Sequence, residues 1–286
     1  MIKLNHIDDK KRLILIDLDG TTLMNDGKTM HPLTIQGLQK TIAQGHIVCI
    51  VTGRPHRGSI SFYNDLGLKT LLCNFNGGHI HDPLLKEFKR LVFPISYDTV
   101  KAVLKENDVK TSLYNGLVEY YNKAVCLKQT DNFERYFHLT DIPTDNFIIG
   151  NLLENWNGSA NNIVLQLKSP LHLDKVIRSL EKYTNTLKIN IWTHDNDKEH
   201  PILDLSNKFI NKGMAAEILS QYYNIDIRDV IAFGDEFNDL EMITKVGYGI
   251  VMKNGIETLK VFSKDITEHT NDEGGVGIYL EKLLNL

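Results

Sequence analysis

Short apolar runs that end directly in polar residues are the feature that most constrains how this chain can fold. The first run, Leu13–Ile16, is uninterrupted and stops at Asp17. A strand that is buried on both faces has this pattern, because neither face then carries polar side chains. Later runs of the same form lie at residues 47–51, 71–75 and 230–233. Such strands predict a parallel sheet that is covered on both faces.

Helical patterns lie between these runs. In residues 34–44, Ile35, Leu38 and Ile42 share one helical face, and residues 215–222 carry a second apolar stripe of this spacing. Strands that alternate with helices favour the α/β class, in which helices pack against a parallel sheet. We therefore expect an α/β fold with a Rossmann-like parallel sheet core.

The middle of the chain has a different pattern. Residues 84–191 contain fewer apolar runs that end in turns and more polar alternation, and the Asn115-Gly116 pair within them is typical of a tight hairpin. The 286 residues of the chain are enough for two domains. We therefore expect an inserted α+β cap domain at residues 84–191 and an α/β core formed by residues 1–83 and 192–286.

The charge of the chain bears on its partners. Its 32 Lys and Arg residues against 36 Asp and Glu residues give a net charge of −4, and no block of basic residues occurs. Nucleic acids and anionic membranes are bound through clustered positive charge, so we expect neither as a partner.

The apolar runs and the cysteines bear on location. Residues 1–12 lack the apolar stretch of a signal peptide, and no apolar run reaches the roughly 18–20 residues of a membrane span. The cysteines, Cys49, Cys73 and Cys126, are odd in number and form no CxxC pair, as in proteins of a reducing compartment. We expect a cytoplasmic protein that is a monomer or a weak homodimer.

Polar clusters follow the ends of the expected strands. Asp17 and Asp19 follow the first run, and Thr52-Gly53-Arg54 follow the second. Residues 235–239 follow a late run, and Lys212 stands just ahead of a helical stripe. Each cluster alone is also explained as a turn or a capped loop. Ligands of open parallel sheets bind beyond the carboxyl ends of the strands, so four clusters at such ends favour one shared site.

The carboxylates in these clusters indicate a metal site. Asp17 and Asp19 are separated by one residue and can project toward one side of the strand end. Two close carboxylates repel each other unless a cation or a proton lies between them. Together with Asp235 and Asp239 they offer the oxygen ligands that Mg²⁺ prefers, and no cluster of Cys and His suggests zinc.

The remaining polar residues suit a phosphate group. The hydroxyl of Thr52 and the backbone N–H of Gly53 can donate hydrogen bonds to phosphate oxygens. The ammonium group of Lys212 can neutralise the negative charge of the phosphate. The sequence therefore predicts a site for Mg²⁺ and a phosphorylated molecule.

Taken together, these motifs resemble those of the haloacid dehalogenase (HAD) superfamily. The matching segments are Asp17-Leu18-Asp19-Gly20-Thr21, Thr52-Gly53-Arg54-Pro55, Lys212-Gly213 and Gly234-Asp235-Glu236-Phe237-Asn238-Asp239. More narrowly, the chain resembles the Cof-type phosphatases, whose large α+β cap (type IIB) is inserted between the second and third motifs. Asn76-Gly77-Gly78 and Asn271-Asp272-Glu273 also match this subgroup, so the resemblance covers essentially the whole chain. Gly274 stands where the subgroup commonly has an acidic residue, which leaves open whether this last loop faces the substrate.

The resemblance implies a role for each core residue. Asp17 would be the nucleophile, Asp19 the general acid and base, and Lys212 a catalytic cation. Mg²⁺ would be held by Asp17, by the backbone carbonyl of Asp19 and by Asp235, with support from Asp239. The residues implied to bind the phosphorylated substrate are Leu18 through its backbone N–H, Thr52, Gly53, Arg54, Lys212 and Asn238.

The function expected from this resemblance is that of a Mg²⁺-dependent phosphatase. It would hydrolyse small phosphorylated metabolites, such as sugar phosphates, nucleotides or pyridoxal phosphate, through an aspartyl-phosphate on Asp17. One alternative is a phosphomutase that uses the same intermediate. Another is a non-catalytic sensor of phosphorylated metabolites, although such a sensor is expected to lose a catalytic carboxylate, and Asp17, Asp19 and Asp235 are all present.

Overall fold

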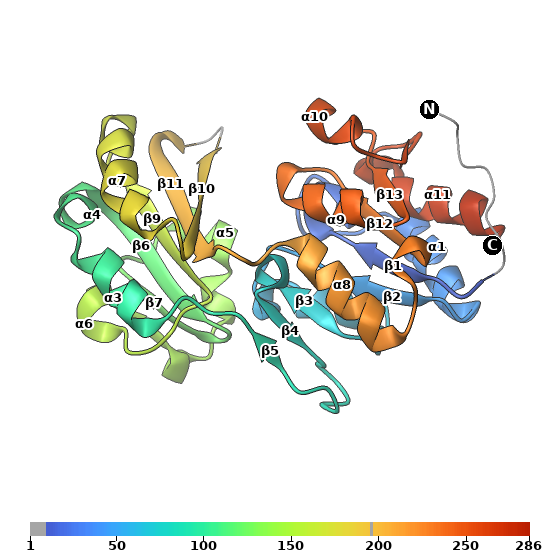
Figure 1. Cartoon of the computed structure of the whole chain (residues 1–286), viewed down its shortest axis with the longest axis horizontal. Helices are drawn as coiled ribbons and strands as arrows, with labels where there is room; N and C mark the ends of the chain where they lie inside the picture. Colours follow the sequence, from blue (N-terminus) through green and yellow to red (C-terminus); the bar gives the residue numbers. More distant parts are fainter. Residues whose placement is uncertain (1–9, 195–196) are drawn as a thin grey trace. The chain divides into compact units, whose positions relative to one another are not determined.

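The computed structural model of this chain describes residues 10–194 and 197–286 (Figure 1). These residues form two compact units. The first comprises the residues up to Gly53, Ser59–Leu91 and Asn211–Leu286, and the second comprises Arg54–Gly58 and Val92–Ile210. Besides the long insertion, therefore, a short segment that begins within the second motif also belongs to the second unit.

A parallel sheet forms the centre of the first unit. Its order is β14-β13-β12-β1-β2, and every neighbouring pair is parallel. Its strands are β1 (Leu13–Ile16), β2 (Ile47–Ile50), β12 (Val230–Gly234), β13 (Tyr248–Val251) and β14 (Asp265–Ile266). The expected α/β fold with a Rossmann-like parallel sheet is confirmed, and β1 lies in it between β12 and β2 (Figure 1).

Helices cover both faces of this sheet. They are α1 (Pro32–Ala43), α2 (Ile60–Asp65), α8 (Lys212–Tyr223), α9 (Leu240–Lys245), α10 (Glu257–Lys260) and α11 (Gly275–Leu284). Ile14 and Ile16 of β1 pack into a cluster with residues of α1 and α11. Leu13 and Leu15 pack into another cluster with residues of α8 and α9. Successive residues of a strand point to opposite faces, so the apolar run of β1 is buried on both sides.

The expected third strand of the sheet is β3 (Leu72–Asn74). A parallel bridge, from Val51 to Cys73, joins it to the chain after β2. It otherwise pairs antiparallel with β4 (His79–His81), in a small sheet that also contains β5 (Leu91–Val92).

The second unit is built on a six-stranded sheet with the order β10-β11-β9-β6-β7-β8. Its strands are β6 (Leu113–Tyr120), β7 (Lys123–Cys126), β8 (Phe147–Ile149), β9 (Asn162–Leu167), β10 (Leu187–His194) and β11 (Asp197–Asn207). Its helices are α3 (Tyr97–Lys105), α4 (Asn107–Ser112), α5 (Asp131–Phe137), α6 (Leu152–Asn155) and α7 (Leu173–Leu180). The neighbouring pairs of this sheet are antiparallel except for β7–β8, and a mainly antiparallel sheet with helices is typical of an α+β unit.

The prediction of a hairpin at Asn115-Gly116 is wrong. Both residues lie inside β6, and the register against β9 shifts between Leu113 and Asn115. The Asn115 carboxamide accepts hydrogen bonds from the N–H groups of Gly116 (2.8 Å) and Lys128 (3.0 Å). The side chain therefore stabilises an irregularity within the strand, and an Asn-Gly pair can serve a β-bulge as well as a turn.

The structure also divides the chain at positions other than 83/84 and 191/192. The long segment of the second unit begins at Val92 and ends at Ile210. The reason at its end is backbone pairing, because β11 forms hydrogen bonds with both β10 and β9. A boundary inside this three-strand array would leave strand edges without their partners.

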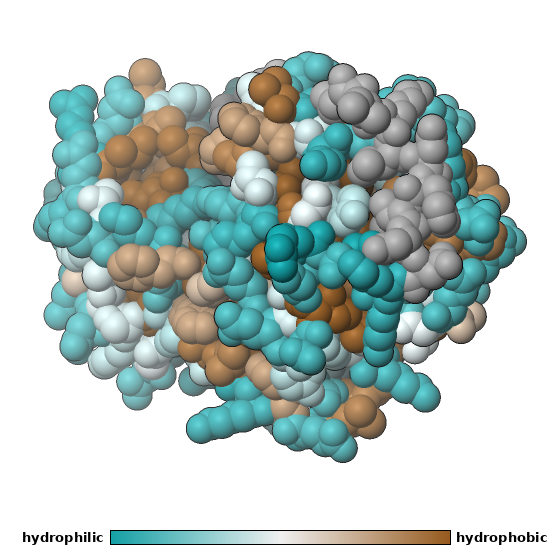
Figure 2. Space-filling view, turned by 45° about the vertical axis from the view of Figure 1, so that its right-hand side comes forward, coloured by the Kyte–Doolittle hydropathy of each residue, from teal (hydrophilic) through white to brown (hydrophobic). Residues whose placement is uncertain are grey.

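Figure 2 shows the surface of the molecule from one side. Hydrophilic residues are spread over the face in view, and hydrophobic ones gather in several separate areas. The large apolar residues that are most exposed include Leu171, Phe209 and Val261. Across the two described stretches, no helix combines the length and the apolarity needed to cross a membrane.

Candidate active site

Asp17 lies directly after β1, which is an inner strand of the parallel sheet of the first unit. Its backbone N–H donates to the carbonyl of Phe233 in β12 (3.2 Å), so the residue continues the ladder of β1. A helical turn, Leu18–Thr22, follows at once, and the Thr22 hydroxyl donates to the carbonyl of Asp17 (2.5 Å). The Asp17 side chain is buried at the carboxyl edge of the sheet, as its place after an apolar run predicts.

Lys212 brings a positive charge to this carboxylate. It is the first residue of α8, and its side chain is fully buried. Its Nζ lies 2.7 Å from Asp17 Oδ1 and 2.6 Å from Asp239 Oδ1. Burial alone would lower the pKa of Lys212, but the two carboxylates outweigh it and raise the pKa above the usual value. The ammonium group therefore stays protonated.

Asp239 uses both of its carboxylate oxygens. While Oδ1 faces Lys212, Oδ2 accepts from the backbone N–H groups of Asp235 (3.0 Å) and Glu236 (3.1 Å). These bonds hold the loop after β12 in shape. Asp239 is therefore suited to orient Lys212 and the Asp235 loop.

Asp17, Asp235 and Asp239 form a compact group of carboxylates. One oxygen from each lies within 4.8 Å of the others. Burial raises the pKa of Asp17 to about 7, against the attraction of Lys212. Burial, together with repulsion from Asp239 and Asp17, raises the pKa of Asp235 to about 8. The single ammonium group of Lys212 does not balance these charges, so the donor set fits a divalent cation with a preference for oxygen ligands.

The turn after Asp17 lies directly against this group. Gly20 has a φ of +68°, and a Cβ at this position would lie 2.1 Å from Asp235 Oδ2. Only glycine satisfies both the backbone conformation and the close approach. The next residue, Thr21, donates its hydroxyl to Asp235 Oδ1 (2.7 Å), whereas Asp19 is exposed.

The residues expected to bind phosphate lie beyond the ends of β2 and β12. Thr52 is buried, donates its N–H to the carbonyl of Cys73 (3.0 Å) and accepts from the N–H of Asn76 (2.9 Å). Asn238 donates its side-chain amide to Asn76 Oδ1 (3.1 Å), and a Cβ on Gly53 would lie 3.3 Å from the same oxygen. Asn76 thus joins the second and fourth motifs.

Arg54 is placed differently from its neighbours Thr52 and Gly53. It belongs to the second unit, and its guanidinium donates to the carbonyl of Gly58 (3.1 Å). Contact between Arg54 and a substrate stays a prediction.

Sequence reasoning placed these segments at one edge of the sheet but did not identify every contact between them. Thr21 and Asn76 lie inside motifs that were recognised, yet their contacts to Asp235 and Asn238 depend on the tertiary structure. Asn76 has a positive φ (+54°), a conformation that asparagine tolerates better than most residues. An asparagine soon after a strand is therefore a sequence signal for such a turn.

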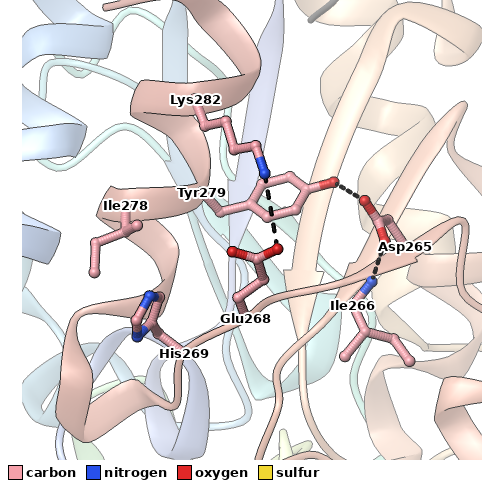
Figure 3. Close-up of a pocket in the computed structure, with 8 residues that line it drawn as sticks. Asp265, Ile266, Glu268, His269, Ile278, Tyr279 and Lys282 are labelled. Carbon is pink, nitrogen blue, oxygen red and sulfur yellow. Dashed lines mark hydrogen bonds and ion pairs between the residues drawn. The ribbon is translucent and has the colours of Figure 1, made fainter. Parts of the chain in front are cut away.

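A separate hollow lies between α11 and the chain after β14 (Figure 3). Tyr279 donates its hydroxyl to Asp265 Oδ2 (2.8 Å), and the N–H of Ile266 donates to Asp265 Oδ1 (2.9 Å). Burial and the Asp265 carboxylate raise the pKa of Tyr279, so its hydroxyl remains a donor. Both carboxylate oxygens already accept hydrogen bonds, and none of the expected site residues lines this hollow. We therefore assign the chemistry to the strand-end cluster.

Comparison with known proteins gives matches over nearly the whole chain. A family model described as haloacid dehalogenase-like hydrolase matches residues 14–280. A putative phosphatase of Metamycoplasma hominis is 31% identical over 274 residues, which are 95% of this chain and 96% of that protein. The 5-amino-6-(5-phospho-D-ribitylamino)uracil phosphatase YitU of Bacillus subtilis is 29% identical over 98% of this chain and 100% of its own length. A solved haloacid dehalogenase-like hydrolase from Bacteroides thetaiotaomicron has the same fold, with a TM-score of 0.78 at 24% identity over 95% of this chain and 99% of that one.

Proposed function

Because this chain belongs to the haloacid dehalogenase-like hydrolases and is a phosphatase of their Cof-type branch, we propose that it works through an aspartyl-phosphate on Asp17 with Mg²⁺ as its cofactor. The observation that carries the proposal is the buried triangle of Asp17, Lys212 and Asp239 at the carboxyl edge of the sheet. A carboxylate is a weak nucleophile, and a fixed cation beside it both orients it and offsets its repulsion from an anionic phosphate.

The first half of the reaction transfers the phosphoryl group to the protein. An oxygen of Asp17 attacks phosphorus, and the bond from phosphorus to the ester oxygen of the substrate breaks. Asp19 donates a proton to that oxygen, so the alcohol leaves in its neutral form. The exposure of Asp19 supports this role, because the acid has to reach the leaving group.

The second half releases the phosphate. Asp19, now ionised, takes a proton from a water molecule that attacks phosphorus. The bond between phosphorus and the Asp17 oxygen breaks, and inorganic phosphate leaves. In both halves Lys212 stays charged and faces the oxygen of Asp17, where it stabilises the negative charge of the transferred group.

The remaining site residues would bind the cofactor and the phosphate group. Asp17, Asp235 and the backbone carbonyl of Asp19 would hold Mg²⁺, with Asp239 in support. When bound, Mg²⁺ supplies positive charge to the phosphoryl oxygens and lowers the pKa values of the carboxylates around it. Further phosphate contacts would come from the Leu18 N–H, Thr52, Gly53, Arg54 and Asn238.

We place the substrate among small phosphorylated metabolites. The Bacillus subtilis relative acts, by its name, on a phosphate ester of a ribityl chain, whose leaving group is an alkyl alcohol. Sugar phosphates, nucleotides and pyridoxal phosphate have leaving groups of the same kind. The second unit would be the cap that selects among them. We further propose that the protein acts in the cytoplasm as a monomer or weak homodimer and without nucleic acid, in keeping with its net charge of −4.

Phosphate release from a panel of these metabolites tests the proposal. The wild type and Asp17→Asn are each assayed with Mg²⁺ and with EDTA. We expect release that needs Mg²⁺ and is lost in Asp17→Asn. A rearranged phosphate ester without free phosphate would indicate a phosphomutase. A folded wild type that changes no compound would favour a sensor and overturn the proposal.

A further inference from the structure

The loop that contains Asn271 and Asp272 binds the segment after the first motif. Asn271 is buried, and its Nδ2 donates to the carbonyl of Leu23 (2.8 Å) and to Asn25 Oδ1 (3.1 Å). The Asp272 carboxylate accepts from the backbone N–H of Asn25 (2.8 Å) and from its side-chain amide. The side chains of Asn271 and Asp272 therefore bind this loop to the segment after the first motif.

A second asparagine extends these contacts to the first motif itself. Asn254 follows β13, and its Nδ2 donates to the carbonyl of Gly20 (2.7 Å). Its Oδ1 accepts from the backbone N–H of Asn271 (3.0 Å). The chain after Asn254 also contacts the loop that carries Asp235, because the N–H of Ile256 donates to the carbonyl of Asp235 (2.9 Å). Asn254 thus connects the first motif with the Asn271 loop.

The two carbonyls held in this way lie within and just after the turn Leu18–Thr22, which carries Asp19. Asp19 has an extended backbone (φ −67°, ψ 129°) although it lies in a helical turn, and Gly20 has a positive φ. A backbone hydrogen bond, from the N–H of Leu23 to the carbonyl of Leu18 (2.8 Å), closes this turn, and the carbonyl of Gly20 is bound by Asn254 instead. Glycine has more accessible conformations than other residues, so this second bond restricts the turn further. Because the carbonyl of Gly20 is one peptide unit from Asp19, its hydrogen bond restricts the direction of the Asp19 side chain.

We propose that Asn254 and Asn271 are positioning residues that aim Asp19 at the leaving oxygen of the substrate. The inference rests on the proposed function, since it concerns the general acid of that reaction. The carboxamide of Asn254 holds the Gly20 carbonyl within the turn, and that of Asn271 holds the Leu23 carbonyl just after it. Neither residue touches the substrate. Their loss should therefore affect proton transfer before it affects phosphate binding.

The choice of substrate isolates this effect. An alkyl phosphate needs a proton on its leaving oxygen, whereas p-nitrophenyl phosphate releases a stable phenolate without one. General acid catalysis contributes roughly 10²–10⁴-fold, and a misdirected acid forfeits part of it. We expect Asn254→Ala to lower kcat for the best alkyl phosphate about 10-fold and kcat for p-nitrophenyl phosphate less than about 3-fold, with KM little changed. Asn271→Asp, which replaces the donor by an acceptor, should show the same selectivity.

Three further variants make the result decisive. Asp19→Ala defines the selectivity of an enzyme without its acid, and Asn254→Gln, which keeps the carboxamide, should recover part of the lost kcat. Lys253 is exposed and lies next to Asn254, so Lys253→Ala should leave kcat unchanged for both substrates. The midpoint of urea unfolding reports on folding, and the exposed Asn254 keeps the test valid even if the buried Asn271→Asp does not fold.

Each outcome decides between the inference and its alternatives. A selective loss with the alkyl phosphate in Asn254→Ala supports it. Equal loss with both substrates, or no loss, in a folded Asn254→Ala enzyme overturns it while the proposed function stands. If Asp19→Ala shows no selectivity, the acid role fails and the inference fails with it. A wild type that releases no phosphate from any compound overturns the proposed function first.

Discussion

Replacing Lys212 with methionine removes the buried charge and keeps a side chain of similar length. In the native site, Nζ is fully buried and lies 2.7 Å from Asp17 and 2.6 Å from Asp239. Lys212→Met leaves both carboxylates without this ammonium group. Removing one partner of a buried ion pair typically costs about 3–5 kcal/mol in the free energy of unfolding.

The loss of stability should depend on pH, because the carboxylates can take up protons. Burial already raises the pKa of Asp17 to about 7, and the attraction of Lys212 opposes that rise. Without Lys212 the pKa rises further above the unfolded value of 3.8. A raised folded-state pKa gives stability that is lost as pH rises. Lys212→Met should therefore be destabilised more at pH 8 than at pH 5.5.

Urea unfolding in EDTA at these two pH values measures the effect. Lys245→Met is a matched control, because Lys245 pairs with Glu217 at the surface (2.8 Å) and should contribute less than about 1 kcal/mol. In the presence of Mg²⁺, Lys212→Met should also lose about 10²–10³-fold in kcat, as when a fixed donor to a developing charge is removed. A loss of stability that is equal at both pH values, or below about 1 kcal/mol at pH 8, would refute the reasoning.

Other residues give predictions of the same kind. Arg57→Ala should cost about 3–5 kcal/mol in urea unfolding, because the buried Glu119 loses a partner at 2.5 Å, and Arg57→Ala with Glu119→Gln should recover part of it. An unchanged unfolding midpoint in Arg57→Ala would contradict this. Gly20→Ala should raise the Mg²⁺ concentration needed for half-maximal phosphate release, since its Cβ would lie 2.1 Å from Asp235 Oδ2; an unshifted Mg²⁺ titration would show that the turn can adjust. Burial raises the pKa of Asp204 to about 7, so the second unit should lose stability as pH rises from 4 to 7. Asp204→Asn should reduce that loss, as followed by urea unfolding at several pH values, and an undiminished loss would assign it to other groups.

Much of the fold follows from local sequence patterns. The run at Leu13–Ile16 predicts a strand buried on both faces, and the structure confirms it as β1 between two parallel neighbours. The hairpin at Asn115-Gly116 was wrong, because a side-chain contact with Lys128 turns this signal into an irregularity within a strand. Local signals of this kind do not reveal a partner farther along the chain.

The candidate site was predicted in its components and not in its contacts. Asp17 and Asp235 were identified from their motifs, and the structure brings them together with Asp239. Asn254 was not identified, because an isolated exposed asparagine after an apolar run has no signal of its own. Its contact with Gly20 arises only when two loops of the same sheet edge meet.

The sequence by itself determined which segments become buried strands and at which edge of the sheet the polar residues after them gather. Apolar periodicity decides which segments become buried strands, and the polar residues that follow them lie at the carboxyl ends. Only the tertiary structure decided which atoms meet. Lys212 and Asp17 are far apart in the chain. Their side chains lie 2.7 Å apart because α8 packs against the sheet that contains β1, and Asp17 directly follows β1. Contacts of this kind depend on the packing of whole elements, which no local pattern encodes.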